Sequence, residues 1–253
     1  TGITIYGIET YSMLIPQRII IAKQMGVPYD TRTKMEVLDD LNDSGVEIII
    51  KPAAIEFAVT NGLNTKKGRI YPLGTISNST TIFDNESGYY PIIEMDEHGF
   101  NNPKGLYNKN KVDIVLIGDS FAEGYSVHSN ETIGAVLRQL DFNAISVGKS
   151  ANGSLIQLAA LKEYAEPLKP KIILWVYFVN DLYDLEWEIK SSFLRKYLDE
   201  DDYSQNLISR QEEIDNVLKN LVQSMWEEEK EKARSLNKTV IKITKLTKRS
   251  HYD

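Results

Sequence analysis

The sequence of 253 residues contains no cysteine and only three histidines. Without cysteine the chain has no disulfides, no thiolate metal sites and no cysteine nucleophile, whichever compartment it occupies. The net charge of −7 argues against nucleic acid as the main partner, because phosphate binding requires a basic face. The sequence also shows no cluster of metal ligands and no phosphate-binding loop, so we predict that the protein uses no metal and no cofactor.

Long hydrophobic runs are also missing. A membrane-spanning helix needs roughly 18 apolar residues, and the two longest candidates, residues 13–22 and 172–179, are shorter. We therefore predict no membrane span in this chain. Because the sequence starts at Thr1 and not at methionine, it leaves open whether a signal or anchor precedes it, and the localisation stays undetermined.

The length allows one large domain with a substantial extension. We predict a mixed α/β extension over residues 1–108 that packs on a core domain over residues 109–253. In the extension, residues 33–41 are typical of a helix and residues 45–51 of a strand. The core contains an acidic helical insert over about residues 182–236, followed by a basic tail that we interpret as a solvated segment.

The core alternates strands and helices, which is typical of a doubly wound α/β fold. We predict strands over residues 112–118, 143–147 and 172–179, with helices over 132–140 and 154–165 between them. Ser129 or Asn130 is the expected N-cap of the first helix. The third strand is apolar on both faces, so we expect it to be buried in a parallel sheet, with Trp175, Tyr177 and Phe178 in the core. The apolar positions expected to be buried in the insert are Trp187, Phe193, Leu194, Leu198, Ile214, Leu218, Leu221 and Met225.

Polar residues follow the predicted strands where an open α/β sheet binds its ligands, which is outside the carboxyl ends of the strands. If the strand order is second–first–third, Ser120 after the first strand and Asn180 after the third meet across the switch point. The backbone N–H groups of Ser120 and Gly153 and the side chain of Asn180 can then converge on one substrate oxygen. We expect Asp119 to hold the turn by hydrogen bonds and Asp181 to cap the next helix.

These segments resemble the conserved blocks of the SGNH (GDSL-type) hydrolase superfamily. Residues 118–124 (GDSFAEG) resemble block I, residues 147–153 (VGKSANG) block II, and residues 178–181 (FVND) block III. The resemblance implies a flavodoxin-like three-layer α/β/α fold with a parallel sheet. It implies Ser120 as nucleophile and Ser120, Gly153 and Asn180 as the oxyanion hole.

The segments YPLG, ISN and GFNNP, within residues 71–103, resemble a bacterial subgroup often found with surface-polysaccharide genes. The implied activity is hydrolysis or transfer of an O-acyl ester, with small-molecule and carbohydrate esters as substrates. The substrate itself, the choice between hydrolase and transferase, and the oligomeric state stay open.

The superfamily completes its triad with an Asp-x-x-His block, which this sequence lacks. His98 is interpreted as a surface turn residue, and His251 is unsuited because it stands two residues from the end. His128, in the loop after block I, is either a solvated side chain or a residue near the site. Three parallel strands are fewer than the superfamily has, so we expect that the C-terminal part of the core is missing here.

Two alternatives remain beside the enzyme. One is a non-catalytic SGNH-like binding domain that lacks the Asp-His base. The other, a flavodoxin-like nucleotide or receiver domain, is disfavoured because the acidic pair and late lysine of a receiver are absent.

Overall fold

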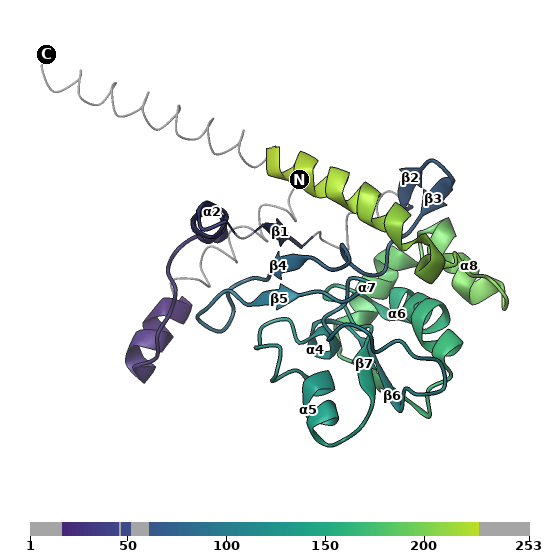
Figure 1. Ribbon diagram of the computed structural model, residues 1–253, viewed down its shortest axis with the longest axis horizontal. Coiled ribbons are helices and arrows are strands. Elements are labelled where there is room, and N and C mark those ends of the chain that lie inside the picture. The colour runs from purple at the N-terminus through teal and green to yellow at the C-terminus, as the bar shows by residue number, and fades with distance from the viewer. Residues whose placement is uncertain (1–16, 46, 52–60, 228–253) are drawn as a thin grey trace, which may run out of the picture.

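The computed structural model describes residues 17–45, 47–51 and 61–227 (Figure 1). His251 and the basic tail therefore lie outside the described residues. The strands form three sheets, with the orders β1–β4–β5, β2–β3 and β7–β6–β8. The strands are β1 (Ile48–Ile50), β2 (Leu63–Thr65), β3 (Gly68–Ile70), β4 (Thr80–Ile82), β5 (Ile92–Glu94), β6 (Ile114–Gly118), β7 (Ala144–Ser146) and β8 (Ile172–Val176).

The helices include the predicted ones. They are α2 (Lys34–Asp43), α4 (Ser120–Glu123), α5 (Ile133–Gln139), α6 (Ser154–Ala160), α7 (Asp181–Glu188) and α8 (Ser192–Asp199). Residues 17–25 and 211–227 are also helical. The N-cap of α5 is Thr132, whose side chain accepts a hydrogen bond from Ala135 N, and not Ser129 or Asn130 as predicted. The predicted helix over 154–165 is α6 continued by a π-helical turn, Leu161–Ala165.

The β7–β6–β8 sheet is parallel, and β6 lies at its centre. This confirms the predicted second–first–third strand order. Every residue of β6 is buried. Because side chains alternate along a strand, Ile114 and Leu116 pack with Leu137 of α5, whereas Val115 and Ile117 pack in the cluster that contains α6. The helices thus cover both faces of the sheet, which gives a mixed α/β arrangement of three layers.

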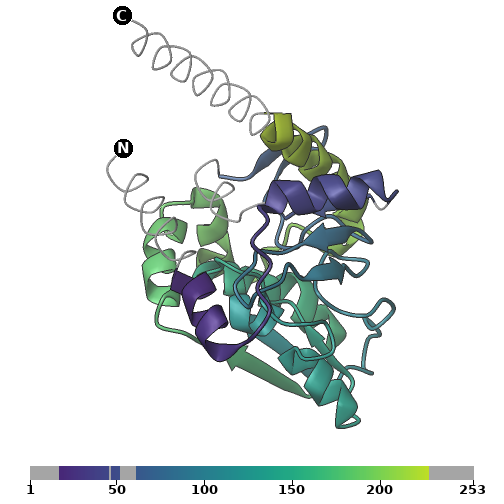
Figure 2. The ribbon, with the colours of Figure 1, turned by 90° about the vertical axis from the view of Figure 1, so that its left-hand side faces the viewer.

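The third core strand, β8, was predicted to be buried, and this prediction is wrong. All residues of β8 before Val176 are exposed, and Trp175, Tyr177 and Phe178 expose 42%, 54% and 47% of their surface. The reason is that β8 is an edge strand, since β6 is its only strand partner among the described residues. Figure 2 shows β8 in green at the margin of the molecule.

Burial in the acidic insert also differs from the prediction. Leu194, Ile214 and Leu218 are buried as expected. Trp187 and Leu198 expose 51% and 59% of their surface, because they lie on the outer sides of α7 and α8. Phe193, Leu221 and Met225 are half-buried.

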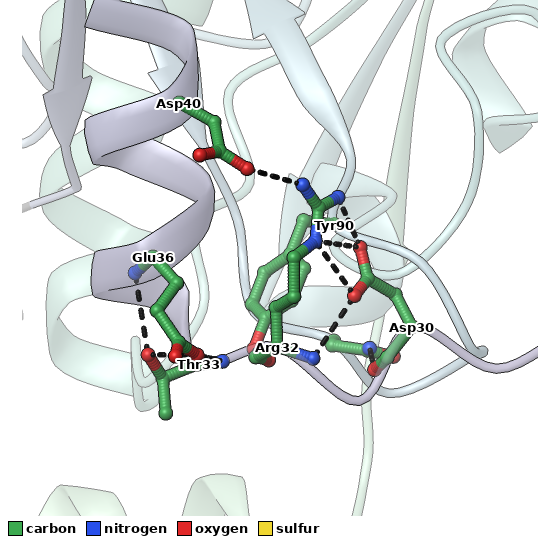
Figure 3. A network of polar contacts seen from close by, with 7 residues as sticks. Asp30, Arg32, Thr33, Glu36, Asp40 and Tyr90 are labelled. Carbon is green, nitrogen blue, oxygen red and sulfur yellow. Dashed lines mark hydrogen bonds and ion pairs between the residues drawn. The ribbon is translucent and has the colours of Figure 1, made fainter.

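Helix α2 of the extension is well capped. The Thr33 hydroxyl accepts a hydrogen bond from Glu36 N at 3.2 Å, and the Glu36 carboxylate accepts one from Thr33 N at 2.7 Å, which is a capping box. Arg32 joins the carboxylates of Asp30 and Asp40 beside it (Figure 3). These local contacts explain why this helix starts where the sequence predicted.

Helix α2 packs on β1 through Val37, Leu38 and Ile48, and Trp226 contacts the same cluster. Helix α2 and the helix of residues 211–227 therefore lie side by side, as Figure 2 also shows. None of the helices in the described part of the chain has the length and apolar character needed to cross a bilayer.

Candidate active site

The turn between β6 and α4 places Ser120 at the carboxyl end of the central strand. Ser120 is the first residue of α4, and Asp119 is the N-cap, whose Oδ1 accepts a hydrogen bond from Phe121 N at 3.0 Å. A Cβ atom on Gly118 would lie 2.5 Å from Val176 O. Glycine is therefore required at this position for β6 and β8 to pair up to the turn. The predicted role of Asp119 in holding the turn agrees with these contacts.

Asn180 reaches the same point from the end of β8. Its Nδ2 donates to Asp119 Oδ2 at 3.4 Å and to Asp184 Oδ2 at 3.3 Å. The ends of the two neighbouring strands thus meet, as the switch-point rule predicted. Asn180 and Ser120 line one cleft of about 590 Å³, together with Phe121, Ser150 and Ala151.

Gly153 is not among the residues that line this cleft. Its N–H donates to Glu188 Oε1 at 2.6 Å, and a Cβ on Gly153 would lie 2.7 Å from Asp184 Cβ. Gly153 is therefore packed against α7. Its predicted part in an oxyanion hole stays a prediction, and it requires that Glu188 release this N–H group.

Glu188 caps the N-terminus of α6 from α7. Besides the bond to Gly153, its carboxylate accepts Leu155 N at 2.8 Å and Ile156 N at 3.3 Å. The side chain is buried, and burial raises the pKa of Glu188 to about 7, although the three N–H groups oppose that shift. Sequence reasoning did not find this residue, because it lies 35 positions from the glycine it contacts.

Sequence reasoning also missed Ser150 and Ala151, although it had identified their loop. A turn from Lys149 to Asn152 sets their direction, with Asn152 N donating to Lys149 O at 3.2 Å. Ala151, in the third position, has a φ of 62°, a conformation that usually belongs to glycine or asparagine. The signal available in the sequence was the loop itself, but not which of its residues faces the cleft.

Asp181 does not cap α7 as predicted. Asn180 is the N-cap and makes no side-chain capping bond, whereas Asp181 is the first helical residue. The Asp181 Oδ2 atom accepts a hydrogen bond from Phe178 N at 3.2 Å, so the carboxylate binds backward to the chain leaving β8. Asp181 is fully buried, and this burial raises the pKa of its carboxyl group.

The histidines that the structure describes lie outside this cleft. His98 is not at the surface as predicted: the Asp96 carboxylate accepts the His98 and Phe100 N–H groups and folds this turn inward. The His98 ring is consequently buried against Tyr107 at a centroid distance of 4.6 Å. The exposed His128 ring stacks on Tyr89 at 4.3 Å, and His128 does not line the cleft.

Two further features bear on the chemistry of the cleft: the hydrogen bonding of the Ser120 hydroxyl and the grouping of possible metal ligands. Among the described ranges, no hydrogen bond to the Ser120 hydroxyl is found. Within the same ranges, no group of three or more histidine, aspartate or glutamate side chains is arranged to hold a metal ion.

Comparisons with known proteins add little to this geometry. No protein-family model matches the chain, and no curated protein matches it. One similar solved structure is described as an esterase AlinE4 mutant. It is 22% identical, with a TM-score of 0.25, and the match covers 46% of this chain and 72% of that chain. A TM-score this low does not bear on the fold or the activity of the present chain.

Proposed function

We propose that the protein is a serine ester hydrolase of the SGNH kind, or an acyltransferase of the same mechanism, with Ser120 as the nucleophile. The supporting observation is the position of Ser120 at the start of α4, in a cleft that Asn180 also lines. A hydroxyl at a strand-to-helix turn is held at the carboxyl end of the sheet, where α/β proteins bind their ligands.

In this proposal Ser120 Oγ attacks the ester carbonyl to form a tetrahedral intermediate, which expels the alcohol with the proton from Ser120 and leaves an acyl-enzyme. Water, or an acceptor alcohol in the case of a transferase, then cleaves the acyl-enzyme and restores Ser120. The Ser120 N–H and the Asn180 amide stabilise the oxyanion, and each such donor contributes about 3–4 kcal/mol. The amide does so by turning one N–H group from Asp119 or Asp184 to the substrate. Gly153 is a third donor only when Glu188 releases its N–H. O-acyl esters, with carbohydrate esters among them, are the proposed substrates.

A general base must take the proton of Ser120, and no histidine in the described part of the chain lines the cleft. This observation supports a second candidate function, a non-catalytic domain that binds acylated ligands in the same cleft. The two candidates share the cleft and differ in whether Ser120 reacts.

The test is hydrolysis of p-nitrophenyl acetate by the chain, by Ser120→Ala and by His128→Ala. Without a base in the cleft, we expect weak turnover, roughly 10³–10⁴ over water from binding and the oxyanion hole. Added imidazole should increase the turnover of the wild type more than that of Ser120→Ala, because it can act as the missing base.

Imidazole-stimulated turnover that is unchanged in Ser120→Ala would show that Ser120 is not the nucleophile. Loss of turnover in His128→Ala would identify that histidine as the base. No reaction, combined with saturable binding of the ester, would favour the binding domain.

A further inference from the structure

The carboxylate of Glu123 is buried directly beneath the turn that carries Ser120. Glu123 is the last residue of α4, the one-turn helix that Ser120 opens, and it is 2% exposed. Its backbone carbonyl accepts a hydrogen bond from Asn101 Nδ2 at 2.9 Å, and its Oε2 atom accepts Ser150 N at 2.7 Å. One residue therefore connects the turn of Ser120 to the loop of Ser150, and both residues line the cleft.

Lys51, which follows β1 in the extension, contacts the buried carboxylate of Glu123. Its ammonium donates to both carboxylate oxygens of Glu123 and to Ser150 Oγ at 2.7 Å. The ammonium also lies 4.7 Å from the ring centroid of Phe83 and 4.8 Å from that of Tyr125. With 7% of its side chain exposed, Lys51 is held on every side, and little water competes for its bonds.

The loop that these two residues hold is under backbone strain. Ala151 directly follows Ser150 and has a φ of 62°, which is uncommon for a residue with a Cβ atom. Such conformations persist where the surrounding contacts over-determine them. Two hydrogen bonds to Ser150 hold the backbone next to Ala151. Its N–H donates to Glu123, and its hydroxyl accepts from Lys51.

We propose that Lys51 and Glu123 are positioning residues, whose buried ion pair fixes Ser150 and Ala151 against Ser120. The extension then takes part in the site, because Lys51 belongs to it. This inference rests on the proposed function for its catalytic meaning, but the positioning itself can be measured without any activity.

Three variants test this inference. Removing one member of a buried ion pair leaves an uncompensated charge, so both are replaced together. Lys51→Met/Glu123→Met removes the ion pair and the acceptor of Ser150 N. Lys51→Met/Glu123→Gln removes the ion pair but keeps an amide oxygen as acceptor. The control is Lys171→Met/Asp113→Asn, which removes an ion pair of 2.7 Å from the opposite end of the same sheet.

Amide hydrogen exchange is the first measurement. We expect exchange at Ser150 and Asn152 to become about tenfold faster in Lys51→Met/Glu123→Met, with β6 unchanged. The Met/Gln double variant should slow exchange at Ser150 only in part, because it keeps an acceptor for Ser150 N but lacks Lys51. The control should leave the loop unaffected. Unchanged exchange at both residues in a folded Lys51→Met/Glu123→Met variant would overturn the proposal.

Covalent labelling of Ser120 by a fluorophosphonate is the second measurement. The labelling rate constant should fall about tenfold in Lys51→Met/Glu123→Met at an unchanged melting temperature, because small displacements at a reacting group are costly. If wild-type Ser120 is not labelled at all, the proposed function fails, while the exchange result still decides the positioning role.

The variant Ser150→Ala covers the case in which Lys51→Met/Glu123→Met does not fold. It removes only the bond from Lys51 to the hydroxyl, at a residue that lines the cleft. Exchange at Asn152 should be faster in this variant than in the wild type, and equal exchange would overturn the proposal.

Discussion

Two buried carboxylates hold the loop between β7 and α6 from opposite sides. Glu123 binds its first half through Ser150 N, and Glu188 binds its second half through Gly153 N. The two differ in their partners. Lys51 forms an ion pair with Glu123, whereas the hydrogen-bond partners of Glu188 among the described residues are backbone N–H groups. An ionised carboxylate without a countercharge is costly to bury, so the fold should favour the protonated form of Glu188.

We predict that Glu188 makes folding stability depend on pH near neutrality. Its pKa is raised by burial from 4.5 to about 7, so the fold favours the protonated form. The stabilisation is complete below pH 4.5 and is lost as the pH rises through about 7. Relative to Glu188→Gln, the wild type should lose up to about 3 kcal/mol of unfolding free energy across that window. Urea unfolding of both proteins from about pH 5 to 8 measures the difference, and parallel stability curves would contradict the prediction.

At the scale of the element, the short strand-to-helix turn after β6 depends on the close approach of β8. Because Gly118 has no Cβ atom, the Val176 carbonyl oxygen can approach it closely; a methyl group there would overlap that oxygen. Because Ser120 and Asn180 stand at the ends of these two strands, separating the strands also separates the two residues. Stability and the geometry of the candidate site are therefore coupled at Gly118.

We predict that Gly118→Ala costs about 3 kcal/mol, since the Cβ atom overlaps backbone that cannot move freely. The control is Gly68→Ala, where φ is also positive, at 107°, but nothing lies within 4 Å of the added atom. Thermal unfolding of the two variants separates the overlap from the cost of the backbone conformation. Equal destabilisation by both would contradict the role assigned to the contact with Val176.

In the turn that carries Ala151, we predict a substitution that stabilises the fold. A glycine adopts a φ of 62° without the steric cost that alanine has there, so Ala151→Gly should relieve strain. We expect unfolding free energy to rise by about 0.5–1 kcal/mol, partly offset by the greater freedom of glycine in the unfolded chain. A loss of stability in a thermal melt would show that Ala151 is not strained.

These elements also show where prediction from sequence succeeds. The run before Ser120 is apolar and ends at a glycine, so local pattern is enough to predict β6 and the turn. The approach of Asn180 to the turn that carries Ser120 follows from strand order, which the connection rules restrict. In contrast, the direction of Gly153 depends on Glu188, and the position of Ser150 depends on Lys51. Those partners lie 35 and 99 positions away in the sequence, so a local sequence pattern cannot predict them.

At the scale of the whole molecule, the two edge strands of the parallel sheet differ in burial: every residue of β7 is buried, whereas the residues of β8 before Val176 are exposed. The same apolar run that predicted a buried strand forms β8, whose outer side stays exposed together with Leu182, Tyr183 and Trp187. Periodicity cannot distinguish these two situations, because burial of an edge depends on what packs beside it. A surface of this kind is uncommon on a monomer and usually binds something.

We predict that the exposed side of β8 binds hydrophobic dyes and promotes self-association of this chain. Fully covering a leucine-sized side chain contributes roughly 1.5–3 kcal/mol, and association costs about 4–15 kcal/mol, so the net affinity should be weak. Leu174→Lys places a charge on the strand and should reduce both dye fluorescence and association. Ile92→Lys is the matched control, since Ile92 is exposed to 43% and Leu174 to 40%, but it lies on β5. Sedimentation and dye fluorescence of the wild type and the two variants test this prediction. Equal decreases in association and fluorescence in both variants would show that exposed apolar area in general, and not the exposed strand β8, causes the association.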